Sequence, residues 1–112
     1  MNTAHFPLSA ALAAAAAQTT ARSVELFRHC TLTIKLYAPR GHDPQTPHTQ
    51  DEIYVIASGS GQFFDGQQRI RVGPGDLLFA AAGQPHRFED FTDGFATWVM
   101  FYGPDGGEAP RS

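Results

Sequence analysis

Three scarcities limit what this chain can be. Its one cysteine, Cys30, excludes an internal disulfide and a four-cysteine zinc site, and a lone thiol is typical of a small buried residue in a reducing compartment. Only eight Lys and Arg residues accompany a net charge of −3, so the basic surface of a nucleic-acid-binding protein is missing. The apolar run Leu8–Ala17 is shorter than the roughly eighteen residues that cross a bilayer. We expect a cytoplasmic protein without nucleic-acid or membrane partners.

The material for one folded core is nevertheless present. The 112 residues suffice for a single domain, and nine Phe, three Tyr and one Trp supply bulky side chains. No Lys or Arg precedes Pro7, so the Ala-rich stretch that follows lacks the positive region of a secretory signal. Because Ala is the best helix former, we expect a short helix from Leu8 to Gln18 instead.

From residue 21 onward, short runs rich in Val, Ile, Thr, Phe and Tyr alternate with Gly, Pro and Asp, which is typical of an all-β domain. Asp65-Gly66 predicts a two-residue type I′ hairpin, and Gly73-Pro74-Gly75 predicts another turn. The tail from Gly103 to Ser112 has no periodicity, so we expect it to fray. The predicted strands are Val24–Cys30, Thr31–Tyr37, Glu52–Ala57, Gly61–Phe64, Gln68–Val72, Asp76–Phe79, Pro85–Glu89 and Ala96–Tyr102.

Alternation along two of these strands predicts which side chains face inward. In Pro85–Glu89, His86 and Phe88 share one face while Arg87 and Glu89 share the other, so the first pair should face the core. The strand Ala96–Tyr102 is apolar on both faces, which indicates burial on both sides. Its outer face should therefore meet another subunit or the N-terminal helix.

Three polar residues are candidates for a shared site. Glu52 opens an apolar strand on the face that also carries Tyr54, and a carboxylate directed inward needs a partner that offsets the cost of burial. His86 presents the same problem beside Phe88. His48 lies four residues before Glu52, a span of about 13 Å on a straight strand. The two can share an ion only if the chain bends at Thr49-Gln50-Asp51, which is a polar segment suited to a corner.

The segment around these residues resembles the cupin family. The first cupin motif pairs two histidines one residue apart with a Glu a few residues on and a Gly further along. His48, Glu52 and Gly59 match that pattern in order and spacing. Thr46 stands where the first histidine is usual, so the resemblance is incomplete at one ligand position.

A second cupin motif follows after a short spacer. Gly75, Gly83 and His86 fall at its expected offsets, whereas Ala81 replaces its Pro and Asp90 replaces its Asn. The two motifs with their spacer cover residues 41 to 90. The resemblance implies an antiparallel double-stranded β-helix, or jelly-roll barrel, with a short N-terminal helix. It divides the chain into a helical segment (1–22), a cupin β-barrel domain (23–103) and a flexible tail (104–112).

The resemblance also implies that His48, Glu52 and His86 hold a divalent metal ion, with Fe, Mn, Ni and Zn all open. Two histidines and one carboxylate form a set known for non-haem Fe(II) with open positions. The remaining shell and pocket would be supplied by water or by neighbouring residues. Those candidates are His42, Gln45, Thr46, Tyr54, Phe63, Phe88 and Trp98.

Three functions are consistent with such a site. The chain could be a metal-dependent oxygenase, isomerase or decarboxylase acting on a small organic molecule. It could instead bind or sense a small ligand without turning it over, or serve as a structural barrel. Because compact cupins are usually homodimers, and the strand Ala96–Tyr102 is apolar on both faces, we also expect a homodimer.

Overall fold

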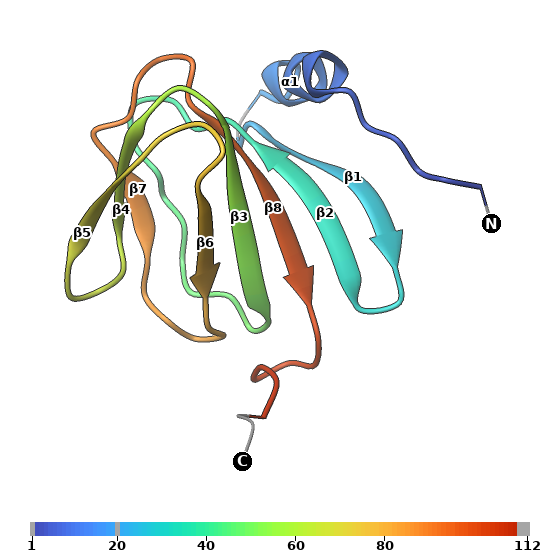
Figure 1. Ribbon diagram of the computed structural model, residues 1–112, viewed down its shortest axis with the longest axis vertical. Coiled ribbons are helices and arrows are strands. Elements are labelled where there is room, and N and C mark those ends of the chain that lie inside the picture. Colours follow the sequence, from blue (N-terminus) through green and yellow to red (C-terminus); the bar gives the residue numbers. More distant parts are fainter. Residues whose placement is uncertain (1, 20, 110–112) are drawn as a thin grey trace.

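The computed structural model describes residues 2–19 and 21–109. Within them it contains the helix α1 (Leu8–Ala16) and eight strands, and α1 is too short to span a membrane. Figure 1 shows the helix lying beside one end of a two-layered β structure. The strands are β1 (Ser23–His29), β2 (Leu32–Tyr37), β3 (Asp51–Ser58), β4 (Gly61–Phe64), β5 (Arg69–Val72), β6 (Leu77–Ala80), β7 (Arg87–Glu89) and β8 (Ala96–Tyr102).

The strands form two antiparallel sheets that face each other. The larger sheet has the order β1-β2-β8-β3-β6, and the smaller one has the order β5-β4-β7. Strands adjacent in each sheet are mostly distant in sequence, which is the connectivity of a jelly roll. The predicted fold class is therefore confirmed. Predicted strands β4 and β8 have the observed bounds, and the others differ by one or two residues.

Two local expectations were wrong. The turn of the hairpin predicted at Asp65-Gly66 is centred on Gly66 and Gln67, because the Asp65 backbone N–H donates to the Gln68 carbonyl at 3.1 Å. The Asp65 carboxylate also accepts hydrogen bonds of 2.8 Å from the backbone N–H groups of Gln67 and Gln68. Asp65 lacks the positive φ that a type I′ turn over Asp65-Gly66 requires. Cys30 is not buried: it is exposed at the β1–β2 turn, with a φ of 52°. The turn geometry, not core packing, determines its place.

The core lies between the sheets, where the inward faces of the strands meet. Its largest fully buried side chains include Tyr54, Phe63 and Phe88. A second cluster lies on the outer face of the large sheet, where Ala11 and Ala15 of α1 pack over Leu36 of β2. Small alanine side chains let the helix approach the sheet closely, which explains why this short helix can dock at all.

The C-terminal segment after β8 runs back across the start of β3. Backbone N–H groups of Gly106 and Glu108 donate to the Thr49 carbonyl at 2.6 Å and to the Asp51 carboxylate at 2.9 Å. These contacts attach residues 106–108 to the edge of the barrel. Residues 110–112 of the tail that we expected to fray lie outside the described residues.

Helix α1 leaves part of the outer face of the large sheet uncovered. Phe79 and Met100 both pair with Ile53, so all three side chains lie on the outer face in one row. Leu77 and Phe79 of the edge strand β6 are 66% and 53% exposed. An apolar row of this kind is unusual on the surface of a monomer. We propose that a second copy of this chain covers it.

Light scattering in solution tests this proposal. We expect a mass of about twice 12.2 kDa at micromolar concentration, and a shift toward 12.2 kDa for Phe79→Glu, because a buried unpaired carboxylate is costly. Ile70→Glu is the control, since Ile70 is an exposed apolar residue on the other sheet. A wild-type mass near 12.2 kDa would contradict the proposal.

Candidate metal centre

The fold brings His48, Glu52 and His86 together. One ligand atom of each lies within 4.8 Å of the others, which is close enough for a single ion. His48 comes from the loop before β3, Glu52 from the second residue of β3 and His86 from the residue before β7. The two sheets and a connecting loop each supply one group. The bend expected between His48 and Glu52 is present, since β3 begins only at Asp51.

The orientation of His86 is set by the backbone. Its Nδ1 lies 2.8 Å from the carbonyl oxygen of Gln84, which can only accept a hydrogen bond, so Nδ1 carries a proton. This contact directs Nε2 into the barrel, where it lies 2.6 Å from Glu52 Oε1 and 3.0 Å from the Tyr54 hydroxyl. A backbone carbonyl on the far ring nitrogen is the usual second contact of a metal-binding histidine.

Glu52 provides the test of whether a cation fits here. Its side chain is only 1% exposed, and Oε2 is the single buried side-chain N or O atom without a hydrogen-bond partner in the described residues. An unpartnered carboxylate oxygen in a buried site is costly. Two imidazole nitrogens and a carboxylate oxygen of Glu52 converge here, and they form a donor set suited to a divalent transition metal. The residues present therefore fit such an ion.

The two histidines differ in their protonation. Burial lowers the pKa of His48 below its ordinary value, and the nearby Glu52 charge only partly opposes this. Burial alone would also lower the pKa of His86, but the hydrogen bond and charge of Glu52 outweigh it and raise that pKa. In the metal-free site His86 therefore keeps its proton to a higher pH than His48 does.

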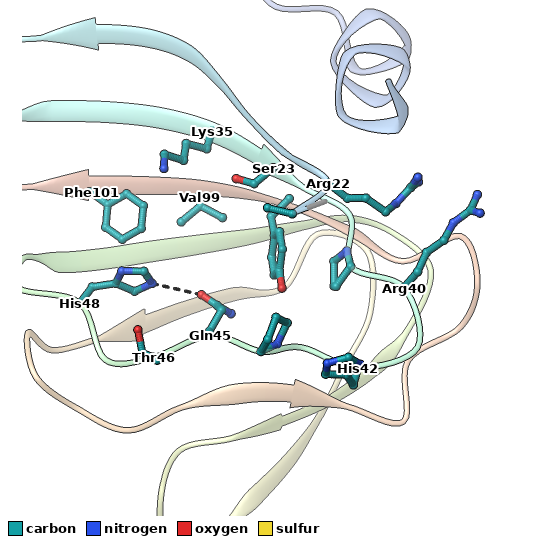
Figure 2. A pocket seen from close by; sticks show the side chains of 14 residues that line it. Arg22, Ser23, Lys35, Arg40, His42, Gln45, Thr46, His48, Val99 and Phe101 are labelled. Carbon is teal, nitrogen blue, oxygen red and sulfur yellow. Dashed lines mark hydrogen bonds between the residues drawn. The ribbon is translucent and has the colours of Figure 1, made fainter. Parts of the chain in front are cut away.

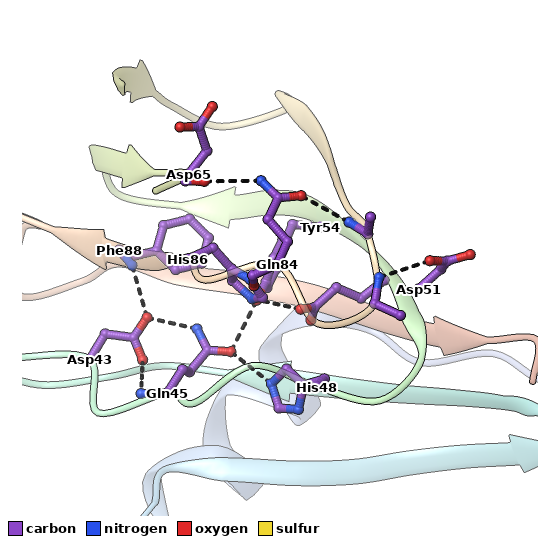
Figure 3. A network of polar contacts seen from close by, with 12 residues as sticks. Asp43, Gln45, His48, Asp51, Tyr54, Asp65, Gln84, His86 and Phe88 are labelled. Atoms are coloured by element: carbon purple, nitrogen blue, oxygen red, sulfur yellow. Dashed lines mark hydrogen bonds and ion pairs between the residues drawn. The ribbon is translucent and has the colours of Figure 1, made fainter. Parts of the chain in front are cut away.

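Tyr54 and Gln45 complete the immediate surroundings. The Tyr54 hydroxyl donates to Gln45 Oε1 at 3.0 Å, and the same oxygen lies 3.3 Å from His48 Nε2. Burial and the Glu52 charge raise the pKa of Tyr54, so its phenol stays protonated in the metal-free site. Figure 3 shows these side chains linked in one polar network. Of the candidates for completing the shell, Gln45 and Tyr54 thus contact the converging ligands through their side chains, whereas His42 and Thr46 do not.

A residue missed by sequence reasoning holds this network in place. The buried Asp43 carboxylate accepts hydrogen bonds from Gln45 Nε2 at 2.7 Å and from the Phe88 backbone N–H at 2.8 Å (Figure 3). It also accepts one from the Tyr37 hydroxyl. It links the large sheet, the loop and the small sheet through one side chain. Asp43 stands in a segment rich in Gly and Pro, where an exposed carboxylate is the ordinary expectation, so the sequence carried no signal of its burial.

The other predicted lining residues divide into two groups. The Phe63 ring stacks 5.7 Å from His86, and the Phe88 ring lies 5.0 Å from Tyr54, so both line the site. Trp98 does not: it packs on the outer cluster beneath α1, on the face of β8 opposite Val99. Its placement in the pocket was wrong because β8 is apolar on both faces and its inward parity was assigned to the wrong residues.

An open pocket of about 410 Å³ leads to His48 (Figure 2). His42 and Thr46 are exposed at its rim and do not belong to the group of three converging ligands. Asp90, which we considered as an inward acid, is exposed with a φ of 49°. Of the three converging residues, His48 lines this pocket, whereas the side chains of Glu52 and His86 are buried behind it. Its lining residues are Ala21, Arg22, Ser23, Lys35, Tyr37, Pro39, Arg40, His42, Pro44, Gln45, Thr46, His48, Val99 and Phe101.

Comparison with known proteins establishes the family. A family model for the cupin domain matches residues 34–102, which is more than half of the chain. The chain therefore belongs to the cupin family. A protein of unknown function from Rhizobium leguminosarum has the same fold, with a TM-score of 0.72 and 15% identity over 91% of this chain and 98% of that one.

Two curated proteins are similar in sequence. An uncharacterised protein of Streptomyces coelicolor is 29% identical over 84 residues, covering 73% of this chain and 80% of that protein. The dimethylsulfoniopropionate lyase DddQ of Ruegeria pomeroyi is 34% identical over 70 residues, covering 61% of this chain but only 35% of the lyase. The crystal structure of that lyase superposes with a TM-score of 0.53 and 28% identity, over 65% of this chain and 39% of the other.

The protonation of the two histidines can be measured by NMR on metal-free protein. We expect His86 to titrate above its ordinary pKa of 6.5 and His48 below it. The pairing of His86 with Glu52 then contributes fully to stability below pH 6.5 and is lost as the pH rises through the raised pKa of His86.

Glu52→Gln removes the negative charge from this pair. The pKa of His86 should then fall below that of the wild type, because burial is the largest remaining influence on it. A His86 pKa that is unchanged in Glu52→Gln would show that the pair does not govern its protonation.

Proposed function

We propose that this cupin is a metal-dependent enzyme that transfers a proton to or from a small organic molecule. The observation that carries the proposal is the position of the Tyr54 hydroxyl, which lies 3.0 Å from His86 Nε2 at the edge of the three converging ligands. A buried phenol beside a ligand set is suited to acid–base chemistry, because its proton affinity responds to the charge next to it. The chemistry would be an elimination or an isomerisation.

His48, Glu52 and His86 would hold the divalent cation, and Gln45 lies near enough to complete or orient the set. When bound, the ion would supply a Lewis acid and a positive charge that offsets Glu52. The protein itself holds His86 through the Gln84 carbonyl and excludes water with the rings of Phe63 and Phe88. Three protein ligands leave coordination positions open, which is typical of catalytic rather than closed structural sites.

We assign the proton-transfer step to Tyr54. Burial and the Glu52 charge keep its phenol protonated in the metal-free site, so the phenolate requires a compensating positive charge nearby. As a phenolate it can accept a proton at Oη from a carbon atom of a substrate that enters past His48. As a phenol it can return that proton to the product. One group can therefore serve as base and acid in turn.

The similarity to a dimethylsulfoniopropionate lyase supports elimination as the first reaction to test. In that reaction a base takes the proton from the carbon next to the carboxylate. The carbon–sulfur bond breaks, and dimethyl sulfide leaves with the electron pair, giving acrylate. The chain spans about a third of the length of that lyase.

The alternative is a cupin that binds or senses a small ligand without turnover. The open pocket of about 410 Å³ would serve that function equally well. Turnover distinguishes the two, because only the enzyme needs the Tyr54 hydroxyl for proton transfer. A binding protein would retain its ligand affinity in Tyr54→Phe and show no product with any substrate.

Metal binding is tested by calorimetric titration with Fe(II), Mn(II), Ni(II) and Zn(II). We expect Glu52→Gln to lower the affinity by at least about 100-fold, because loss of even an outer contact costs about 10- to 100-fold. His42→Ala is the matched control, since this exposed histidine lies outside the converging group. The metal assignment fails if wild type and Glu52→Gln bind equally well, or if wild type binds none of the four ions.

The role of Tyr54 is tested with dimethylsulfoniopropionate and metal-loaded protein. We expect Tyr54→Phe to lower turnover by about 100-fold or more, the usual effect of a lost general acid–base group, while metal affinity changes little. Tyr102→Phe removes a hydroxyl from β8 that makes no side-chain contact with the site, and should leave turnover unchanged. Equal turnover in wild type and Tyr54→Phe would refute the proton-transfer role.

A further inference from the structure

Lys35 is a charged residue on the inner surface of the barrel that the metal site does not explain. It lies on β2 between Thr33 and Tyr37, whose side chains are buried on the inner face, whereas Leu36 packs outward beneath α1. Because side chains alternate along a strand, Lys35 shares the inner face. Figure 2 shows it with Phe101 at the His48 end of the pocket.

The ammonium group of Lys35 has no acidic partner within ion-pair distance among residues 2–19 and 21–109. The acid nearest to it in register is Glu25 on β1, and the Arg28 guanidinium already binds that carboxylate at 2.6 Å. Lys35 Nζ lies instead 5.6 Å from the centre of the Phe101 ring. The Lys35 charge contributes to a lowered pKa of Glu25, so that carboxylate acts on it from a distance, but Lys35 itself has only the cation–π contact and no ion pair.

Phe101 places this charge next to the candidate centre. The same ring that lies under Lys35 Nζ packs edge-on against His48, with 4.8 Å between the ring centres. The lysine and the metal-facing histidine therefore contact one aromatic surface. A molecule lying on Phe101 would reach both groups at once.

The rest of the pocket favours an anion with an apolar part. None of its lining residues is Asp or Glu, while Arg22, Arg40 and His42 lie at the end away from His48 (Figure 2). Val99 and Phe101 supply the apolar wall near Lys35. A pocket lined by one sign of charge attracts ligands of the opposite sign and disfavours cations.

We propose that Lys35 is the specificity-determining residue of this pocket and that the ligand is a short-chain organic carboxylate. The carboxylate lies on the Lys35 ammonium, the hydrocarbon part lies on Phe101, and the reacting carbon points toward His48. This names the substrate class of the proposed enzyme and so rests on that function. The ammonium–carboxylate contact itself requires no metal ion, so it can be tested separately.

The test is an NMR titration of metal-free protein with sodium propionate, and with propionamide as its uncharged counterpart. We expect propionate to shift the backbone signals of Val99 and Phe101, and Lys35→Met to weaken its binding by about tenfold, the effect of losing one charge-assisted hydrogen bond. Lys35→Arg keeps the charge and should restore most of the affinity. Propionamide should bind more weakly and be insensitive to Lys35→Met.

Arg71→Met is the matched control, because Arg71 is an exposed cation of β5 outside the pocket. It should leave propionate binding unchanged. The proposal is overturned if Lys35→Met binds propionate as tightly as wild type does, or if wild-type protein shows no shifts around the pocket. If Lys35→Met fails to fold, the measurement is repeated with Lys35→Gln, after its amide signals have been shown to match the wild-type pattern.

Zinc titration of the same variants separates this proposal from the proposed function. Lys35→Met should bind Zn(II) at least as tightly as wild type, since a nearby positive charge has been removed. If wild type binds propionate through Lys35 but no metal, the enzymatic proposal fails and the carboxylate pocket stands. If wild type binds metal and its propionate affinity is unchanged in Lys35→Met, the carboxylate proposal fails while the enzymatic proposal stands.

Discussion

The contact on which the site depends is the one between Glu52 and His86, 2.6 Å apart and both almost fully buried. Glu52 belongs to the large sheet, and His86 leads into the small one, so the pair joins the two layers at the centre of the barrel. Two charged groups can be buried together only when their hydrogen bonds are satisfied. Here one carboxylate oxygen stays unpartnered, which makes the pair an incomplete arrangement that a cation would complete.

Among the described residues, the other buried side-chain N and O atoms have hydrogen-bond partners, so Glu52 Oε2 is the exception that indicates a place for a cation. Asp43 saturates its carboxylate with donors from Tyr37, Gln45 and the Phe88 backbone. By doing so it holds the long loop before β3 against both sheets and keeps Gln45 beside Tyr54. Asp43 therefore contributes to stability and orientation, whereas Glu52 contributes a free ligand. Two buried acids in one barrel have different roles because their partners differ.

Membership of the cupin family does not determine what such a barrel does, since one fold supports many functions. What distinguishes this chain is the combination of a phenol beside the ligand set, at Tyr54, with an unpaired ammonium at the pocket, at Lys35. The first group is suited to moving a proton and the second to holding a carboxylate. Our two proposals rest on these two groups, the proton transfer on Tyr54 and the carboxylate binding on Lys35.

The sequence by itself determined the features that depend on local alternation and spacing. In the strand around residue 86, the exposed-type residues Arg87 and Glu89 alternate with His86 and Phe88. Because side chains alternate between the two faces of a strand, this pattern indicated which face is inward, and the inward direction of Glu52 was inferred in the same way. The resemblance to the first cupin motif brought His48 into the predicted set. Trp98 was misplaced because β8 is apolar on both faces, so its pattern holds no contrast from which a face can be read.

Only the tertiary structure decided the burial of Asp43 and the inward place of Lys35. The surroundings of Asp43 come from Tyr37 and Phe88, which lie on separate sheets and are distant in sequence. The polar residues of β2, Thr33 and Lys35, resemble an ordinary solvent face. Only the docking of α1 onto Leu36 identifies the opposite face as the outer one and so places Lys35 on the inner face. Which side of a strand is covered is a property of the packed layers, and no single strand encodes it.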